Sequence, residues 1–428
     1  MEKLIIKNFA GLQDIEISIN KINLLIGPQA SGKSIIAKLL FYFRSIIKEI
    51  FISGVKLESK KIFDKKFKKL FEECFPPDSW GESEFIIQYV LDDQHIEIHK
   101  SIKKKQGISN LSLIYSDFYK RSLSQVRLLA KKTQETINSV SILHESTTEA
   151  SVYFEVQHRF LKTVAEQLKS ESAFDQLFIP AGRSLFAIYD ENIFGFLSKD
   201  LPIDPLLIHL GQYYERARHL VNSGIHQSTQ HKQTHDWLLE FNQLKTEILV
   251  GKYVRFQGKD YIQSSDGRRV RLSYSSSGQQ EILPLVLILE SLCFFPSGVM
   301  GTSTYIEEPE AHLFPRAQRD IVNLIATAYN LRKSRLQFFV TTHSPYVLTA
   351  FNNLIQAGIL SKSGYHDRVL EIMPESQILN PDDIAAYHVV DGKARSIIDP
   401  ETQLIDAQII DSISEELAIQ FDQLLEIE

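Results

Sequence analysis

The chain has 428 residues, of which 43% are hydrophobic and 23% are charged, with a formal net charge of −6. This length and composition suffice for one large domain or two to three ordinary ones and exclude a disordered chain. The net negative charge excludes a surface that is basic overall and binds nucleic acid through that charge, although a local basic patch is compatible with it.

Only two cysteines are present, Cys74 and Cys293. They exclude a disulfide scaffold and any cysteine-based metal site, and they fit a reducing compartment. No apolar run is long enough for a signal peptide or a membrane span. We therefore expect a cytoplasmic protein with no membrane partner.

The N-terminal third is predicted to start with strands at 4–9, 15–19 and 21–26, followed by a helix from about Lys33. Residues 56–69 are rich in lysine with aromatic residues between the charges. We interpret them as an amphipathic helix with a solvated face, with a contact to nucleic-acid phosphates as the alternative. Residues 85–91 and 95–102 are expected to form an antiparallel pair that turns at 92–93.

Residues 116–170 are predicted to form two long helices of about 25 residues, each about 40 Å long, with a break at 145–148. An apolar stripe with a spacing of four residues follows the second helix. A short strand is expected at 177–180, then helices over 186–250 with an exposed polar loop at 226–235. Residues 253–272 are predicted to form a β-meander that turns at 266–267.

Residues 27–34, Gly-Pro-Gln-Ala-Ser-Gly-Lys-Ser, match the pattern GxxxxGK[ST] between an apolar strand and an amphipathic helix. Small residues let backbone N–H groups close on a β-phosphate at a helix N-terminus. Lys33 adds charge at the β- and γ-phosphates, and the Ser34 hydroxyl ligates Mg²⁺. We expect ATP at Gly27, Gln29, Ala30, Ser31, Gly32, Lys33 and Ser34. Ala30 stands where many such loops carry glycine, a change that should preserve binding.

Residues 303–310 are predicted to form a strand that ends in the carboxylates Glu307, Glu308 and Glu310. Successive side chains on a strand point in opposite directions. We assign Glu307 to the Mg²⁺ shell and Glu308 to the base that polarises the attacking water. A charged loop cap is the alternative. Glu307 is longer than the more usual Asp, which favours a water-bridged contact with the metal.

Residues 272–280, Leu-Ser-Tyr-Ser-Ser-Ser-Gly-Gln-Gln, lead into an apolar helix. Ser277 is predicted to cap this helix, with Gln280 closing a capping box. Pro284 is expected early in the helix, where its missing N–H costs least. The helix N-terminus would then present hydroxyl and N–H groups to an anion.

This segment resembles the signature motif of ATP-binding-cassette ATPases, and it lies shortly before the acidic strand, as in that family. The resemblance implies that Ser276, Ser277, Gly278 and Gln279 complete the nucleotide site of a second subunit, with Ser276 and Gly278 at the γ-phosphate of the partner's ATP. Ser275 and Ser277 depart from the common Leu and first Gly of the motif.

Residues 337–345, Gln-Phe-Phe-Val-Thr-Thr-His-Ser-Pro, form a β-rich run that ends in a polar turn. A lone histidine at a strand end is usually a structural hydrogen-bonding residue. Here the order of motifs resembles that of the cassette family, which implies that His343 is the switch histidine. It would then contact the γ-phosphate and position the water.

Lys33 and Glu307 are 274 residues apart, a longer spacing than in compact RecA-like or AAA+ cores. The spacing resembles SMC-like and OLD-like ATPases, in which a split head carries an inserted helical arm. The sequence segments at 7–9, 178–184, 305–315 and 342–345 resemble those of the OLD-like branch more closely. Arg183 is then a candidate phosphate or subunit contact, or else an exposed arginine in a structural turn. His312 is expected to be structural.

The predicted fold is α/β, an ABC/SMC-type ATPase head with a mixed central sheet flanked by helices and an inserted helical hairpin arm. Residues 1–115 would form the N-terminal part of the head, 116–175 the hairpin, and 176–428 the C-terminal part. OLD enzymes proper continue into a TOPRIM nuclease. The 85 residues after His343 lack its Asp-x-Asp cluster, so we expect the end of the head and an acidic helical tail at 406–428.

By resemblance, the protein is expected to be a Mg²⁺-dependent ATPase that forms a homodimer or higher homo-oligomer with ATP at the subunit interface. The implied setting is a two-component antiphage system such as PARIS or Septu, in which the ATPase is the sensor or motor and controls a separate nuclease or toxin. Two alternatives stay open. One is an SMC-like ATPase that binds DNA in repair or maintenance, and the other is a non-hydrolysing assembly module.

Overall fold

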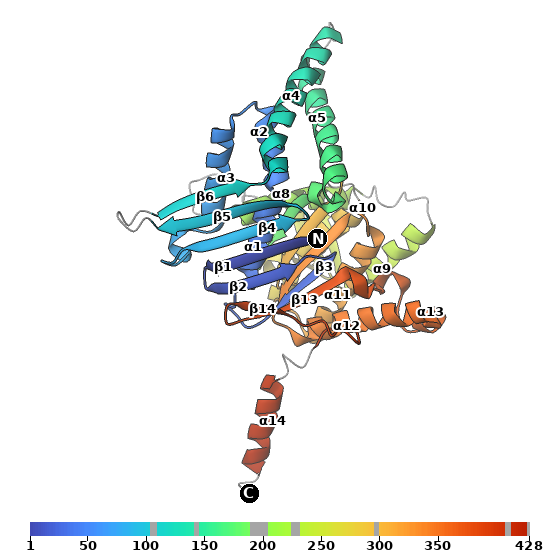
Figure 1. Cartoon of the computed structure of the whole chain (residues 1–428). Helices are drawn as coiled ribbons and strands as arrows, with labels where there is room; N and C mark the ends of the chain where they lie inside the picture. Colours follow the sequence, from blue (N-terminus) through green and yellow to red (C-terminus); the bar gives the residue numbers. More distant parts are fainter. Residues whose placement is uncertain are drawn as a thin grey trace.

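The computed structural model describes residues 1–102, 109–140, 145–188, 204–223, 232–294, 299–406 and 412–425. An 11-stranded mixed sheet crosses the head in the order β6-β5-β4-β1-β2-β14-β13-β3-β12-β11-β7, with helices on both faces (Figure 1). The strands of this sheet are β1 Glu2–Phe9, β2 Leu12–Ser18, β3 Ile22–Ile26, β4 Phe85–Leu91, β5 Gln94–Ile102, β6 Ser109–Tyr115, β7 Asp175–Ile179, β11 Thr302–Glu307, β12 Leu336–Thr342, β13 Ile384–Val390 and β14 Lys393–Ser396.

A second sheet contains the meander of β8 Lys252–Phe256, β9 Lys259–Gln263 and β10 Arg269–Arg271. The helices are α1 Lys33–Arg44, α2 Ile46–Val55, α3 Lys60–Cys74, α4 Asp117–Val140, α5 Glu145–Gln167, α6 Leu185–Ile188, α8 Pro205–Asn222, α9 Lys232–Leu249, α10 Ser277–Phe294, α11 Pro315–Leu331, α12 Pro345–Leu360, α13 His366–Leu370 and α14 Ser412–Leu425. The predicted fold class is confirmed.

The large sheet has an antiparallel half and a parallel half. Strands β6 to β2 pair antiparallel, whereas β13, β3, β12, β11 and β7 run parallel to one another. All residues of β3, β11 and β12 are buried. Parallel strands covered on both faces are usually rich in apolar residues, and β3 and most of β12 follow this pattern, whereas β11 also buries Thr302, Ser303 and Thr304.

The core consists of two apolar clusters that lie on opposite faces of the parallel strands. Leu25 and Tyr305 belong to the cluster under α1 to α5, whereas their neighbours Leu24 and Ile306 belong to the cluster under α8 to α12. Tyr305 stacks on the rings of two adjacent strands, at centroid distances of 4.6 Å to Phe339 and 5.9 Å to Phe178. This register fixes β7, β11 and β12 relative to one another.

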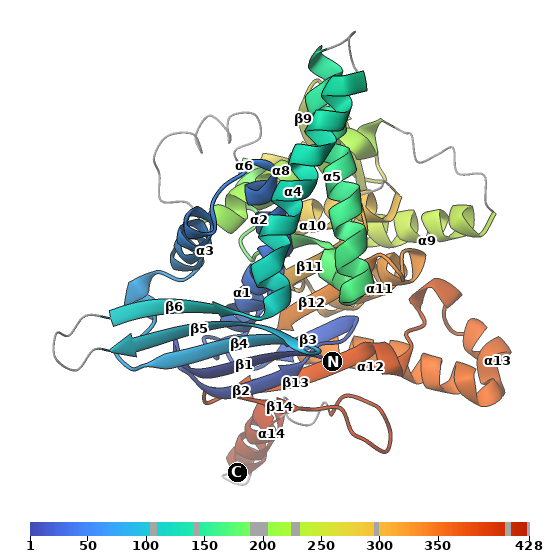
Figure 2. The same cartoon turned by 45° about the horizontal axis from the view of Figure 1, so that its top comes forward.

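The helices α4 and α5 form a hairpin that projects from the head (Figures 1 and 2). The predicted apolar stripe is buried at Val156, Phe160 and Val164. At the base, Gly54 of α2 lies so close to α4 that a Cβ atom there would be 2.4 Å from Val126 Cγ1. The break predicted at 145–148 is wrong, because α5 already begins at Glu145; residues 141–144 lie outside the described residues.

Most short-range predictions agree with the structure. The lysine-rich segment forms α3, which buries Phe63, Phe67 and Phe71 and leaves most of its lysines solvated. The strands β4 and β5 pair with Leu91 opposite Gln94, and the meander turns at 266–267. The polar loop predicted at 226–235 is partly wrong, because α9 starts at Lys232 and 226–231 lie outside the described residues.

The sequence patterns missed β6, β13 and β14 because these strands are short or interrupted by polar residues. In the part of the chain that the structure describes, no helix is both long and apolar enough to cross a membrane.

A buried polar cluster ties α1 to the sheet. Arg44 donates from Nε to Glu2 Oε1 at 2.7 Å and from Nη2 to Glu2 Oε2 at 2.8 Å, and Nη1 donates to Ser303 and Gln337. The opposite charge of Arg44 and these hydrogen bonds keep the pKa of Glu2 below its usual value, although burial acts in the other direction as the largest single contribution. The cluster joins β1, β11 and β12 to the end of α1.

Removing Arg44 should destabilise the protein strongly, because it would leave the Glu2 carboxylate buried without its partner. We expect Arg44→Met to lower the free energy of unfolding by about 3–5 kcal/mol, and Glu2→Leu combined with Arg44→Met to lose less. Urea unfolding measures both. The exposed pair Lys69–Glu73 is the control, since Lys69→Ala should change stability by less than about 0.5 kcal/mol. Equal losses for the single and double variants would contradict this role of Arg44.

Candidate active site

The carboxyl ends of the parallel strands place the predicted site residues at one edge of the sheet. The phosphate-binding loop follows β3, His343 follows β12, and Glu308 follows β11. The strand β12 pairs with both β3 and β11, so His343 is expected between the phosphate-binding loop and the acidic segment. Ligands of open α/β sheets bind at this edge.

The phosphate-binding loop is closed around the Lys33 ammonium. Lys33 Nζ donates to the carbonyl oxygens of Gly27 and Pro28 at 2.8 and 2.7 Å. Burial lowers the pKa of Lys33, while the negative charges of Glu308 and Glu310 oppose this lowering. The ammonium is thus surrounded by oxygen atoms that a phosphate could replace.

Backbone geometry explains the small residues of the loop. A Cβ atom at Gly27 would lie 2.0 Å from the carbonyl oxygen of Val389 in β13, so a side chain there would collide with the sheet. Ala30 has φ +60°, a left-handed conformation that costs about 1–2 kcal/mol for a residue other than glycine. This explains why glycine is common at that position and why alanine, with its small side chain, can replace it.

A cavity of about 280 Å³ borders the loop on the side of the β1–β2 turn. Its walls come from Ala10 and Gly11 in that turn, from Gln29 in the loop, and from Asp391 and Gly392 between β13 and β14. Residues 391–392 lie more than 350 residues along the chain from the loop, so sequence inspection did not associate them with it. The cavity adjoins the loop where the outer part of a bound nucleotide could lie.

Glu308 and His343 contact each other directly, with 2.8 Å between Glu308 Oε1 and His343 Nε2. Glu308 has φ +44°, a strained conformation for a residue with a side chain. Strain of this kind persists only where the surrounding structure holds it in place, and it is concentrated at functional sites. The contact brings the predicted base and the predicted switch histidine together.

Glu310 holds the start of the His343 loop, a role beyond those predicted for the acidic strand end. Its Oε1 accepts hydrogen bonds from Thr342 Oγ1 at 2.5 Å and from the backbone N–H of His343 at 2.9 Å. Glu310 Oε2 and His343 Nδ1 are buried and have no hydrogen-bond partner among the described residues. The third carboxylate of Glu-Glu-Pro-Glu is therefore a positioning residue, and its closeness to the predicted base was the available sequence clue.

The geometry of Glu307 bears on the expected Mg²⁺. Its Oε2 faces the backbone N–H of Ala181 at 3.3 Å, while Oε1 is buried without a hydrogen-bond partner in the described part of the chain. Ser34 is exposed at the start of α1. The water-bridged contact of Glu307 with the metal stays a prediction.

Among the described residues, no group of three or more His, Cys, Asp or Glu side chains forms a ready metal site. Mg²⁺ in phosphate-transfer sites usually keeps several waters and binds one or two protein groups together with the substrate phosphates. The residues present fit that mode of binding.

The signature-like segment forms a capping box one residue earlier than predicted. Ser276 Oγ accepts from the N–H of Gln279 at 3.3 Å, and Gln279 Oε1 accepts from the N–H of Ser276 at 3.2 Å. The prediction of Ser277 and Gln280 as the box is therefore wrong. Pro284 lies well inside α10 rather than early in it.

The signature-like segment contacts residues other than the phosphate-binding loop. Gln279 Nε2 donates to the carbonyl of Leu249 at 2.7 Å, and a Cβ atom at Gly278 would be 2.8 Å from the carbonyl oxygen of His312. Ser276 and Ser277 are exposed. Another molecule can reach both side chains, although the Ser276 hydroxyl already bonds Gln279 within the cap.

Both interpretations of Arg183 fail, because its side chain is fully buried. Its Nη1 donates to the carbonyl of Glu307 at 2.7 Å and its Nη2 to that of Glu308 at 2.9 Å. The carboxylate of Glu281 accepts the backbone N–H groups of residues 182–184. A buried arginine with these partners cannot contact a phosphate or a second subunit.

A phosphate-binding loop, a histidine and an acidic strand end on three neighbouring parallel strands define a P-loop ATPase. The profile of the AAA ATPase domain family matches residues 1–181 and 212–348, well over half of the chain, and the chain therefore belongs to this family. A comparison with curated protein sequences gives no match.

Three solved structures illustrate the similarity in fold. The SMC head domain from Thermotoga maritima is 12% identical, and the match covers 92% of this chain and 97% of that chain with a TM-score of 0.36. An Smc head domain from Pyrococcus furiosus, with an extended coiled coil and bound to the C-terminal domain of ScpA, is 13% identical over 98% and 100%, with a TM-score of 0.36. The recombination mediator protein RecF with ATPrS is 11% identical over 92% and 97%, with a TM-score of 0.31.

Lys33 and Glu310 should affect different steps. We expect Lys33→Ala to lose ATP binding, since it removes the charge at the phosphates. Glu310→Gln should keep ATP affinity within a few-fold but lower kcat about ten- to a hundredfold, because a neutral amide oxygen accepts the two hydrogen bonds of the His343 loop more weakly than a carboxylate oxygen does.

Nucleotide titration and steady-state turnover separate the two effects, and the exposed Glu371→Gln is the control for charge removal. Retained affinity in Lys33→Ala would contradict the loop assignment. A change in KM alone for Glu310→Gln would contradict the positioning role.

Proposed function

We propose that the chain is a Mg²⁺-dependent ATPase of the ABC/OLD-like type that works as a homo-oligomer. The observation that carries this proposal is the contact of 2.8 Å between Glu308 and His343, beside a phosphate-binding loop whose lysine lies within the electrostatic influence of the same carboxylate. Glu308 would take a proton from the attacking water, and His343 would orient the γ-phosphate. Mg²⁺, held by Ser34 and through water by Glu307, would neutralise phosphate charge.

The homo-oligomer is inferred from the signature-like segment. Ser276 and Ser277 are exposed at the N-terminus of α10, where N–H groups and the helix dipole favour an anion. Their own chain engages this segment at Leu249 and His312. A second copy that brings its phosphate-binding loop to this helix end would complete an ATP site at the interface.

Within this class, we infer an antiphage sensor or motor subunit that controls a separate effector such as a nuclease or toxin. The support is the resemblance of residues 178–184 and 305–315 to OLD-like ATPases. The SMC-like alternative, a DNA-binding ATPase, is supported by the solvated lysines of α3 and by the projecting hairpin of α4 and α5.

Glu308→Gln tests the catalytic assignment. The amide cannot accept a proton, so we expect ATP to bind normally while turnover falls about a hundredfold or more, with the closed oligomer accumulating. Phosphate release and light scattering with ATP measure the two effects, against Glu371→Gln as the control. Normal turnover would remove Glu308 as the base. Unchanged assembly together with negligible wild-type turnover would favour the non-hydrolysing module.

Co-purification distinguishes the antiphage and DNA-binding settings. The tagged protein is expressed with its genomic neighbours, and we expect ATP-dependent capture of a neighbouring nuclease or toxin. The alternative predicts instead that duplex DNA stimulates turnover, with a steep loss at higher salt and in the variant Lys61→Glu/Lys65→Glu/Lys69→Glu. Capture of DNA without an effector would replace the antiphage proposal with the SMC-like one.

A further inference from the structure

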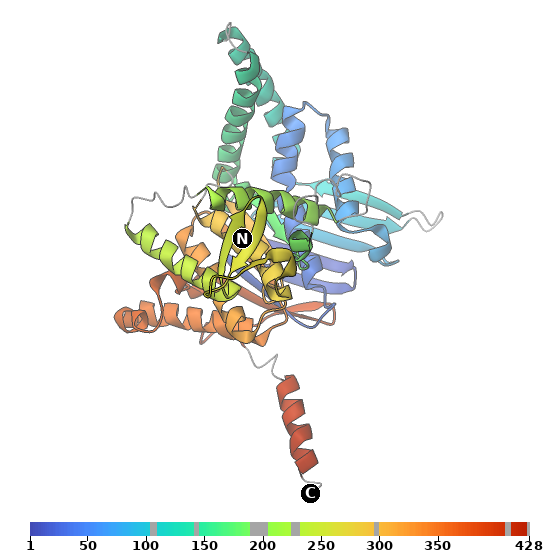
Figure 3. The same cartoon turned by 180° about the vertical axis from the view of Figure 1, so that it is seen from behind.

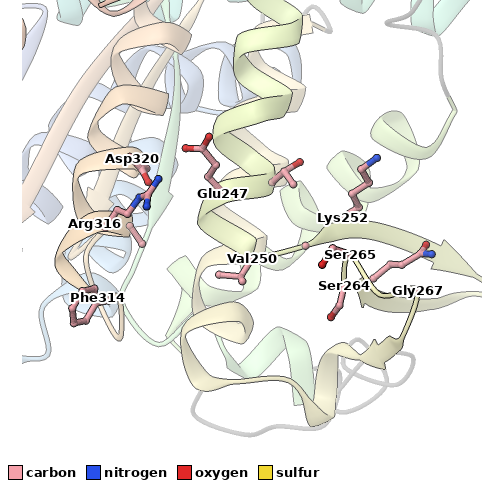
Figure 4. Close-up of a pocket in the computed structure, with 13 residues that line it drawn as sticks. Glu247, Val250, Lys252, Ser264, Ser265, Gly267, Phe314, Arg316 and Asp320 are labelled. Atoms are coloured by element: carbon pink, nitrogen blue, oxygen red, sulfur yellow. The ribbon is translucent and has the colours of Figure 1, made fainter.

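An open groove lies on the head between α9, the meander and α11 (Figure 4). Its volume is about 810 Å³, within the range of about 300–1,000 Å³ typical of binding pockets. Two large apolar side chains at the groove are mostly exposed, Val250 at 77% and Phe314 at 79%. Exposed apolar side chains that meet in a concave surface usually mark an interaction site.

The meander side of the groove is positively charged. Residues 252–271 contain six basic side chains and two acidic ones. Lys252 and Arg316 line the groove and are exposed. Two carboxylates, Glu247 and Asp320, also line it, but Asp320 is buried and bound to a neighbouring arginine. An apolar groove beside this basic strand region suits an acidic amphipathic ligand.

The C-terminal helix α14 has the complementary properties. Phe421, Leu424 and Leu425 follow the spacing of one helix face, and each is more than half exposed. Residues 406–428 contain seven carboxylates and neither Lys nor Arg. The helix stands clear of the head (Figures 1 and 3), so its apolar face is turned to solvent.

We propose that α14 of one copy docks in this groove on a second copy, with Phe421, Leu424 and Leu425 against Val250 and Phe314. An amphipathic helix commonly binds a groove through residues at this spacing. The carboxylates of the tail would lie beside the basic residues of the meander. A small interface of this kind gives weak association, which steering by opposite charges and a second contact between the copies would strengthen.

Other partners for α14 within the homo-oligomer are less suitable. Two α14 helices would bring together acidic segments that repel each other. The lysines of α3 offer charge, but the apolar face of α3 is already buried in the core at Phe63, Phe67 and Phe71. The groove combines positive charge with exposed apolar side chains. The inference requires neither ATP hydrolysis nor the proposed antiphage setting.

Cross-linking of two differently tagged full-length chains, Val250→Cys and Phe421→Cys, tests the proposal with a short bis-maleimide. The native thiols give little background, because Cys74 and Cys293 are buried and burial raises the pKa of Cys74 to about 12. We expect a product that joins the two tags in at least fivefold excess over the control pair Val250→Cys and Ile372→Cys. Ile372, at 81% exposure, is more exposed than Phe421, at 61%, but lies beyond α13.

Adding Lys252→Glu and Arg316→Glu to the Val250→Cys chain should lower the yield at least fivefold, with an unchanged melting temperature. A yield equal to that of the control pair would overturn the proposal. A chain that carries both cysteines and cross-links only within itself would also overturn it, because α14 would then occupy the groove of its own head. Loss of turnover in Glu308→Gln would leave the cross-link unchanged, so the two proposals fail separately.

Discussion

The buried guanidinium of Arg183 joins the segments that the site depends on. It binds the carbonyl oxygens of Glu307 and Glu308, while its own loop is held by the carboxylate of Glu281 in α10. Burial lowers the pKa of Arg183, against the nearby negative charge of Glu281. The attraction within a buried ion pair offsets the cost of removing both charges from water only when their remaining polar atoms are also hydrogen-bonded. Here backbone carbonyl groups bind the guanidinium of Arg183, and backbone N–H groups bind the carboxylate of Glu281.

This junction explains how the acidic strand end keeps a strained conformation. A left-handed φ at Glu308 costs about 1–3 kcal/mol and persists only where the surroundings over-determine it. The carbonyl of Glu308 is fixed by Arg183, its N–H donates to the carbonyl of Thr341, and its carboxylate meets His343. Because Glu281 directly follows the signature-like segment, the helix whose N-terminus carries the exposed Ser276 is linked through Arg183 to the backbone of the proposed base.

Local patterns in the sequence were sufficient to predict the strands and helices that position the site. They were not sufficient to predict its long-range polar contacts. The pattern at 27–34, the apolar runs of β3 and β12, and the amphipathic α3 each follow from neighbouring residues. The predicted exposure of Arg183 is wrong because the prediction follows the general rule that a charged residue in a Gly-containing turn is exposed. Its burial depends on carbonyl groups 124 and 125 residues away, and no local period records them.

Several polar atoms at the carboxyl ends of the parallel strands are buried without a hydrogen-bond partner among the described residues. Glu307 Oε1, Glu310 Oε2 and His343 Nδ1 are buried without hydrogen bonds from the described residues, although Glu2 and Arg44 satisfy each other on the far side of α1. Each such atom costs about 1–3 kcal/mol unless water or a ligand supplies a partner. A bound nucleotide with its metal and water would provide donors and charge at these atoms. Binding would then stabilise the same residues that carry out the proposed chemistry, which couples occupancy of the site to the order of the acidic strand end.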